Sequence, residues 1–454
     1  MIYTVEVLIE MEDIMIPSLY TLGDGLRLRV YRTRRFKAGM LSVSAVLPIE
    51  GRQVWMTSLL LSVLRRGTVR YPSLAEINRR LDYLYGTELS IRNFYRGDSQ
   101  IIGLAADLLD TSYLPDADES LTGGVLEVME QILFHPLLDE NGLLDARYVE
   151  SEKQLQCDQI RSLKNHPRAY AVQQCRQILY DKEPCGVPLY GTEEQVMAVT
   201  PAQLTAHWRE LKENLTLDCF YVGGEEPATV ARALTRTLGG EMSGRAPGEA
   251  TLYRRVIRRA GQERRRDGTL AVGQGQLVMG MRSGVAMGDP EFYACMVFNE
   301  LFGASPISKL FMNVREKLSL CYHCASAYDS YKGTLMVTCG LENRNRRRAE
   351  KEILRQLKAI CQGDFTDAEL EGAKSSLENG YRQLEDSPAA MESYYYGRAL
   401  AGVDQSLEHC RACFGAVTRE DVIAVAKGIS VDTVFFLKGT LSREEVACDD
   451  ECME

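Results

Sequence analysis

Cysteine residues that could hold a metal ion occur as two closely spaced pairs in the second half of the sequence. Cys321-Tyr-His-Cys324 and Cys410-Arg-Ala-Cys413 are C-x-x-C pairs, and His323 lies inside the first. Four sulfurs from two such pairs form a structural zinc site when both pairs lie in short turns. The first pair opens a predicted strand, whose alternation would aim Cys321 and Cys324 at opposite faces, and the second lies in a predicted helix. We therefore predict that these cysteines pack as small buried residues, and we do not expect a metal-binding or redox role.

Arg315 and Tyr322, seven residues apart in Val314-Arg-Glu-Lys-Leu-Ser-Leu-Cys-Tyr322, could hold a peptide. The guanidinium of Arg315 offers a planar fork of donors to peptide carbonyls or a carboxylate. The phenol of Tyr322 could stabilise a developing oxyanion. From the residues alone, a solvent-exposed helix end and a strand aromatic are the simpler interpretation.

The elements that would position these residues follow one order, which occurs twice. In each half, alternating strands lead into an apolar helix and a second helix, then two more strands, long helices and a closing strand. In the first half we predict strands at 26–31, 40–47, 87–95, 100–106 and 217–222, and helices at 54–66, 74–84, 119–134 and 145–164. In the second half we predict strands at 276–281, 322–328, 335–340 and 432–437, and helices at 291–301, 307–317, 350–361 and 367–384.

Detailed agreement between the halves appears before each closing strand. Thr200-Pro-Ala-Gln-Leu in the first half matches Thr418-Arg-Glu-Asp-Val in the second. We therefore predict an α+β protein of two homologous α/β-sandwich domains that arose by internal duplication, each a mostly antiparallel sheet covered by helices. The predicted domains are residues 1–224 and 269–440, followed by an acidic tail at 441–454.

A basic segment joins the two predicted domains. Residues 225–268 include RRVIRRAGQERRR, from Arg254 to Arg266. A nucleic-acid or acidic-partner patch is possible in principle, but blocks of like charge are usually exposed, and we interpret the segment as a solvated linker. The net charge of −10 and a pI near 5.3 also argue against a general nucleic-acid binder.

The cellular location follows from the cysteines and the apolar segments. Thirteen scattered cysteines are an odd number and are more typical of reduced thiols than of a disulfide framework. No stretch approaches the ~20 apolar residues that a membrane span needs. The first residues also lack the basic region followed by an apolar region that marks a secretory signal. We expect a cytoplasmic protein without a membrane span.

With these elements in place, the chain resembles the insulinase, or pitrilysin-type, family of zinc peptidases, in its two-domain bacterial form. Active members carry His-x-x-Glu-His followed four residues later by Gly-Thr or Gly-Ser, and Gly67-Thr68 lies in that frame here. The resemblance places Ser58 and Ser62 where the two histidines would be and Leu61 where the catalytic glutamate would be. Neither serine nor leucine competes for zinc or activates water.

The third zinc ligand of the family is a glutamate in a later helix. The matching segment is Glu152-Lys-Gln-Leu-Gln-Cys-Asp-Gln-Ile160, followed by Pro167. Gln159 falls at the ligand position. The resemblance therefore implies that all three ligands and the general base are absent, that the chain has no catalytic residue of its own and that it binds no metal or other cofactor.

The family segment Leu-Arg-Glu-x-x-Gly-Leu-Ala-Tyr, by contrast, has a match in this chain. Its Arg and Tyr, which help to hold substrate, correspond to Arg315 and Tyr322. In two-domain relatives these residues complete the zinc site of a partner subunit. The resemblance thus implies an inactive subunit, similar to the YfmF-like branch connected with elongation factor P modification, that lends Arg315 and Tyr322 to a zinc-bearing partner.

We therefore expect a catalytically inactive, peptide-binding subunit that forms a heterodimer with an active zinc peptidase of the same family. Peptide is expected to add as an extra strand at an exposed sheet edge. Two alternatives remain. One is a self-sufficient metallopeptidase with unrecognised ligands, and the other is a pure structural scaffold. The sequence does not identify the partner, the peptide or the pathway.

Overall fold

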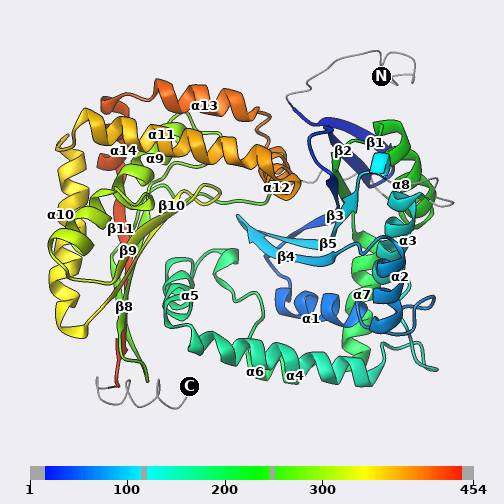
Figure 1. The fold of residues 1–454 in the computed structure, drawn as a ribbon. Coiled ribbons are helices and arrows are strands. Elements are labelled where there is room, and N and C mark those ends of the chain that lie inside the picture. Colours follow the sequence, from blue (N-terminus) through cyan, green and yellow to red (C-terminus); the bar gives the residue numbers. More distant parts are fainter. Residues whose placement is uncertain (1–15, 114–119, 246–250, 442–454) are drawn as a thin grey trace.

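The protein folds into two halves, each with one sheet and its own helices. The computed structural model describes residues 16–113, 120–245 and 251–441. Figure 1 shows the halves side by side, with α5 and α12 lying between them. None of the helices in these ranges is long and apolar enough to cross a membrane.

The first half contains a six-stranded sheet in the order β1-β2-β6-β3-β5-β4. Its β2 strand alternates buried leucines and valine with partly exposed arginines, which is the pattern of a strand that has one face on a core. All neighbouring strands are antiparallel except β2 and β6. The strands are β1 (Ser18–Gly23), β2 (Leu26–Arg32), β3 (Ala38–Pro48), β4 (Leu89–Arg96), β5 (Ser99–Leu109) and β6 (Leu217–Gly223).

The second half repeats this sheet without an equivalent of β1, in the order β7-β11-β8-β10-β9. Its one parallel pair, β7 with β11, corresponds to β2 with β6. The strands are β7 (Arg264–Leu270), β8 (Gly275–Arg282), β9 (His323–Asp329), β10 (Thr334–Leu341) and β11 (Ser430–Gly439). The predicted α+β fold with two related domains is confirmed.

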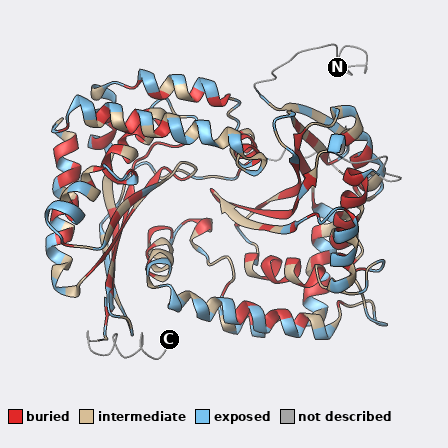
Figure 2. Ribbon diagram, viewed as in Figure 1, coloured by how far each residue is buried: buried red, intermediate tan, exposed pale blue. Residues whose placement is uncertain are grey.

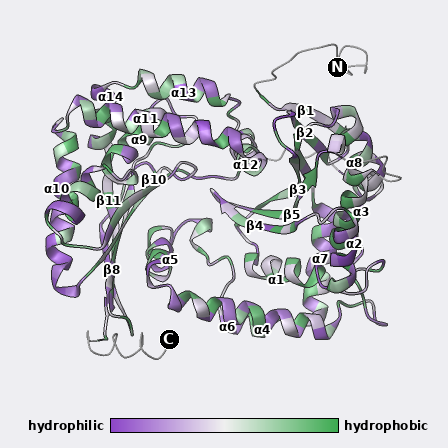
Figure 3. Cartoon of the chain, in the orientation of Figure 1, coloured by the Kyte–Doolittle hydropathy of each residue, from purple (hydrophilic) through white to green (hydrophobic). Residues whose placement is uncertain are grey.

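Helices cover both sheets. Figure 3 shows hydrophilic and apolar patches along α10, which buries Ile353 and Ile360 and exposes most of its charged residues, Glu352 excepted. The first half contains α1 (Val54–Leu64), α2 (Leu74–Tyr83), α3 (Leu121–Phe134), α4 (Ala146–Ser162), α5 (Pro167–Leu179), α6 (Glu193–Met197), α7 (Pro201–Asn214) and α8 (Pro227–Met242). The second contains α9 (Phe292–Asn299), α10 (Arg346–Cys361), α11 (Asp367–Gln383), α12 (Pro388–Leu400), α13 (Leu407–Ala416) and α14 (Arg419–Gly428).

The repeat extends to the lengths of corresponding helices. The 17-residue α4, the 3₁₀ turn η2 (Leu163–Asn165) and the 13-residue α5 match the 17-residue α11, the 3₁₀ turn η7 (Leu384–Asp386) and the 13-residue α12. Both α5 and α12 begin with proline at the first helical position, where its missing N–H costs nothing. Thr200 and Thr418, matched in the sequence, both form capping boxes.

Each half places one helix on the sheet of the other half. α5 packs against β8 and β11, and α12 packs against β6 and β3. On α5 the buried residues Ala171, Cys175 and Leu179 recur every four positions along one side, whereas α12 is buried on several sides; Figure 2 colours both helices by burial. Apolar side chains of both halves meet at each contact, with Ala171 and Cys175 beside Phe435, and Phe220 beside Tyr396. This exchange of helices ties the halves together.

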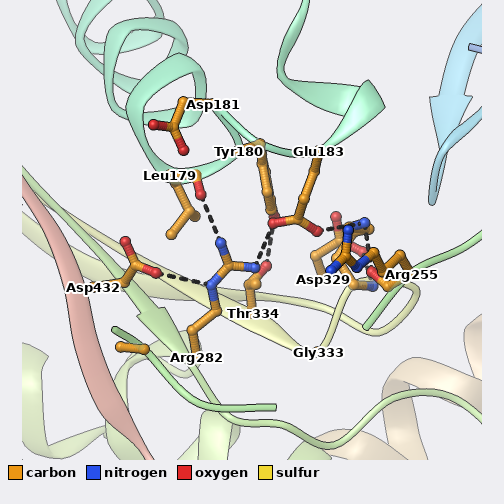
Figure 4. A network of polar contacts seen from close by, with 12 residues as sticks. Leu179, Tyr180, Asp181, Glu183, Arg255, Arg282, Asp329, Gly333, Thr334 and Asp432 are labelled. Carbon is orange, nitrogen blue, oxygen red and sulfur yellow. Dashed lines mark hydrogen bonds and ion pairs between the residues drawn. The ribbon is translucent and has the colours of Figure 1, made fainter. Parts of the chain in front are cut away.

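A buried network of charges reinforces the contact at the end of α5 (Figure 4). Lys332 Nζ lies 2.8 Å from both carboxylate oxygens of Asp98 and 2.7 Å from Glu183 Oε2. Arg282 contacts Glu183 Oε1 at 2.8 Å and donates to Asp432 Oδ2 at 3.1 Å. Lys332 and Arg282 are each 1% exposed, so both cations exchange water entirely for protein partners.

The predicted linker at 225–268 is wrong in most of its described part. The segment contains α8, whose Val230, Leu234 and Leu238 join the core of the first half, and it contains the start of β7. Its arginines pair within the chain, including Arg258 with Asp289 and Arg264 with Asp432. The expected acidic tail at 441–454 lies outside the described residues except for Leu441.

Candidate functional site

The helix that matches the zinc motif, α1, is buried on all sides. Nine of its eleven residues are buried, because nearly every position is apolar. A helix that is apolar all round belongs inside a protein and presents no face to solvent. α1 packs against α4, α6, α7 and β4.

Ser58, in the position of the first histidine, is 3% exposed and lies in a closed set of hydrogen bonds. Its hydroxyl lies 2.9 Å from the Leu189 carbonyl and 3.0 Å from that of Val54, and Asn93 Nδ2 donates to it at 2.8 Å. Asn93 Oδ1 in turn accepts from Gln100 Nε2 at 2.8 Å. Neutral hydroxyl and amide groups therefore satisfy one another where a metal would need charged or imidazole ligands.

Leu61 and Ser62 complete the mismatch with a zinc site. Leu61, in the position of the catalytic glutamate, is 4% exposed and belongs to the core of the first half. Ser62 is half-buried. These residues do not fit zinc, and we derive no catalytic step from them.

The facing helix, α4, contributes amides and a neutralised carboxylate. Gln156 Nε2 donates to the carbonyls of Trp55, at 3.1 Å, and Tyr190, at 3.0 Å. Glu152, which is 8% exposed, pairs with Arg66 at the end of α1, so its charge is already compensated. Gln159 follows one turn beyond Gln156 and is exposed.

Arg315 lies in a π-helical turn of the second half, η5 (Phe311–Lys317). Its side chain is 43% exposed, with the guanidinium carbon 4.6 Å from the ring centroid of Phe311. The turn ends at Ser319, whose φ of +46° lies in the left-handed region that glycine favours. Ser319 stands where the family segment has its glycine, so the backbone turn is retained although the residue has changed.

Tyr322 is 58% exposed and stands at the start of β9, where its N–H donates to the Gly340 carbonyl at 2.9 Å. β9 is the last strand of its sheet, as β4 is of the other. η5 packs against β9 and α10, whereas α1 packs within the first half. Arg315 and Tyr322 thus belong to the second half with β9, whereas α1 lies in the first half (Figure 1).

The prediction that Cys321 and Cys324 point to opposite faces is wrong. β9 begins at His323, so strand alternation does not reach Cys321, and Cys324 lies directly opposite Cys339 on β10. The sulfurs of Cys321, Cys324 and Cys339 all lie within 4.8 Å of one another. The hairpin register, which pairs residues 324 and 339, is the signal that could have found the third cysteine.

In the second pair, Cys410 is a small buried residue as expected, whereas Cys413 is half-buried. Cys410 is fully buried, with its sulfur 2.9 Å from the Tyr394 hydroxyl and 3.4 Å from that of Tyr293. Cys413 lies one turn further along α13, 3.4 Å from His409 Nε2. Among the described residues, neither Cys410 nor Cys413 lies close enough to Cys321, Cys324 and Cys339 to share a metal site with them.

Comparisons with known proteins agree with this arrangement. Residues 198–377 match the family model "Peptidase M16 inactive domain". The chain is 31% identical to "Probable inactive metalloprotease YmfF" of Bacillus subtilis over 92% of this chain and 96% of that protein. It is 25% identical to "Uncharacterized zinc protease YmxG" of the same organism over 66% of this chain and 71% of that protein.

Solved structures share the fold. A conserved protein from Enterococcus faecalis superimposes with a TM-score of 0.86 at 24% identity, over 94% of this chain and 99% of that one. An M16 inactive-domain protein from Pseudomonas fluorescens does so with a TM-score of 0.76 at 16% identity, again over 94% and 99%.

A duplicated α+β fold whose zinc-motif helix has no ligands defines an inactive homologue of a metallopeptidase. The chain belongs to the M16 metallopeptidase family, the family that the sequence resembles.

Proposed function

We propose that this chain is the inactive subunit of a heterodimeric peptidase and that it supplies Arg315 and Tyr322 to the zinc site of an active M16 partner. The observation that carries the proposal is the contrast in exposure between the two sets of family positions. Ser58 and Leu61 are sealed in a core, whereas the Arg315 and Tyr322 side chains are 43% and 58% exposed. Solvent-facing donors are available to a substrate that a partner holds.

Main-chain pairing would bring the peptide to these groups. β9 is an edge strand that begins next to Tyr322, and a peptide added there would form backbone hydrogen bonds without reading its own sequence. Arg315, on the turn that packs against β9, would then bind a carbonyl or carboxylate of the added strand. Broad specificity follows from this mode of binding.

Exposed apolar residues beside these donors are suitable for a subunit interface. Met312 and Leu318, on or next to η5, are 47% and 39% exposed, and Ile307 is 54% exposed. Exposed large apolar side chains are common on protein contact surfaces. We propose that the zinc-bearing partner covers this surface.

The test is a paired substitution, Arg315→Ala with Tyr322→Phe, assayed as a complex with an M16 peptidase of the same organism that has an intact His-x-x-Glu-His. We expect kcat/KM for a quenched peptide to fall at least about tenfold, because both groups act on bound substrate. Complex formation should persist.

The matched control is Arg147→Ala with Tyr85→Phe, which removes the same chemical groups from exposed positions in the first half. Unchanged turnover in the Arg315/Tyr322 variant, with the complex intact, would favour a pure scaffold over our proposal.

A further inference from the structure

Three thiols meet beside Tyr322 at the edge of the second sheet. Cys324 and Cys339 face each other across β9 and β10 in the core, 2% and 0% exposed, and Cys321 is half-buried just before β9. All three sulfurs lie within 4.8 Å of one another. The half-buried thiol is accessible from outside, and two further thiols lie within reach behind it.

The cluster favours one negative charge on Cys321. The neighbouring thiols of Cys324 and Cys339, with smaller contributions from His323 and Arg315, lower the pKa of Cys321 to about 4. The pKa values of Cys324 and Cys339 are raised. A thiolate with two protonated neighbours is the arrangement of a nucleophile with resolving thiols.

A structural metal site is a poorer match for the same atoms. Structural zinc takes four ligands, whereas the part of the chain that the structure describes brings three thiols together here. His323 cannot supply the fourth because it alternates to the opposite face, where its Nε2 lies 3.2 Å from Thr338 Oγ1. A disulfide, which is neutral, suits the apolar surroundings of Cys324 and Cys339 better than a cluster of thiolates.

We propose that Cys321, Cys324 and Cys339 form a redox-active thiol cluster, in which Cys321 reacts with a hydroperoxide and then forms a disulfide with one of the two buried thiols. The Cys321 thiolate attacks the peroxide O–O bond, which gives a sulfenic acid and, after protonation, an alcohol or water. The sulfur of Cys324 or Cys339 then attacks the sulfenic sulfur, and water leaves. Two thiols are oxidised to one disulfide as the peroxide is reduced.

The disulfide would restrain Cys321, which directly precedes Tyr322. A bond from Cys321 to Cys324 closes a loop that contains only Tyr322 and His323, and a bond to Cys339 fastens the same segment to β10. Either bond changes the position of the Tyr322 side chain. The effect on turnover rests on the proposed function, whereas formation of the disulfide does not.

The first experiment uses the full chain alone, treated with hydrogen peroxide and mapped by mass spectrometry. We expect one disulfide within the trio, reversed by dithiothreitol and lost in Cys321→Ser. Cys324→Ala with Cys339→Ala should leave Cys321 as a sulfenic acid that dimedone traps. The control Cys361→Ser removes another half-buried cysteine, and in this variant the disulfide should still form.

Alkylation of reduced protein at about pH 5.5, well below the ordinary thiol pKa of about 8.5, gives a second readout. Iodoacetamide should label Cys321 selectively, because burial raises the pKa values of the half-buried Cys361 and Cys413. A trio that stays reduced under peroxide, or stoichiometric zinc that protects all three thiols, would overturn the proposal.

The second experiment measures the assembled pair after oxidation. We expect kcat/KM to fall about tenfold, since a displacement of about 1 Å in a positioning group has effects of this order or larger. Pairs with Cys321→Ser should lose nothing on oxidation. A disulfide that forms without changing turnover would overturn the coupling to Tyr322. Failure of the Arg315/Tyr322 test would overturn the proposed function but would not affect the proposed thiol chemistry.

Discussion

At the residue scale, Ser58, which the resemblance places at a zinc-ligand position, has a structural role. Its hydroxyl joins α1, the loop at Leu189 and β4 through three hydrogen-bond contacts at 2.8–3.0 Å. Loss of a buried histidine alone would leave the polar groups around it without hydrogen-bond partners. Here the substituted residue, Asn93 and Gln100 form a network whose polar atoms have partners, so stability now depends on the residues that replaced the ligands.

Replacement of Ser58 by alanine should therefore destabilise the fold without affecting any chemistry. The change leaves the Leu189 carbonyl and Asn93 Nδ2 buried without this partner, at a cost of about 1–3 kcal/mol in the free energy of unfolding. Ser62→Ala, at the half-buried second position, should change it by less than about 0.5 kcal/mol. Urea titration measures both, and equal effects would contradict the role given to Ser58.

The cysteines show where residue-scale inference from sequence stops. The C-x-x-C spacing is visible in the sequence, but the orientation of Cys321 depends on whether the strand begins at residue 321 or at 323. The third thiol depends on the hairpin register, which places Cys339 opposite Cys324. Strand ends are the least certain part of a sequence prediction, and here they decide the chemistry.

At the element scale, the repeated plan was predictable because each half carries its own local signals. The period of the apolar residues gives nearly the observed bounds for the strands and helices that are predicted. Thr200 and Thr418 cap α7 and α14, which are not among the predicted helices. α8 was missed although Val230, Leu234 and Leu238 have helical spacing, because the arginines that follow dominated the interpretation. The exchange of α5 and α12 has no local signal, since each helix finds its partner sheet far along the chain.

The docking of α5 gives the element-scale prediction. Ala171 is fully buried against the second sheet, whereas Ala169, two residues earlier on the same helix, is exposed. Ala171→Asp should lower the free energy of unfolding by about 3 kcal/mol or more, because it buries an unpaired charge. Ala169→Asp should have little effect.

Limited proteolysis together with urea unfolding would measure this difference. Early cleavage between α4 and β6 in the Ala171 variant is the expected sign of an undocked α5. If the two variants behave alike, α5 does not hold the halves together.

At the scale of the whole molecule, buried charges fix one arrangement of the halves. Lys332 of the second half neutralises Asp98 of the first and Glu183 of the α5 segment, and it also donates to the Arg255 carbonyl at 2.6 Å. Asp98 and Lys332 are 234 residues apart, so no sequence pattern links them. The ammonium group fills the space between Asp98 and Glu183 where a cation could otherwise bind.

Lys332→Met should therefore loosen the junction of the halves. The change removes the paired cation of the buried Asp98 and one of the two cations that contact Glu183, and loss of one partner of a buried ion pair typically costs about 3–5 kcal/mol. Lys351→Met, an exposed lysine on α10, is the control. The thermal or urea unfolding curve of Lys332→Met should shift to lower stability or split into two transitions, and that of Lys351→Met should not. An unchanged curve for Lys332→Met would show that the network contributes little to stability.

The central claim is that metal chemistry is absent from this chain and comes from a partner. The most direct measurement is the rate at which a quenched peptide is cleaved by the chain alone with added zinc, by the zinc-bearing M16 partner alone, and by an equimolar mixture of the two. We predict no cleavage by the chain alone and a higher rate for the mixture than for the partner alone. Cleavage by the chain alone that a chelator abolishes would contradict the account.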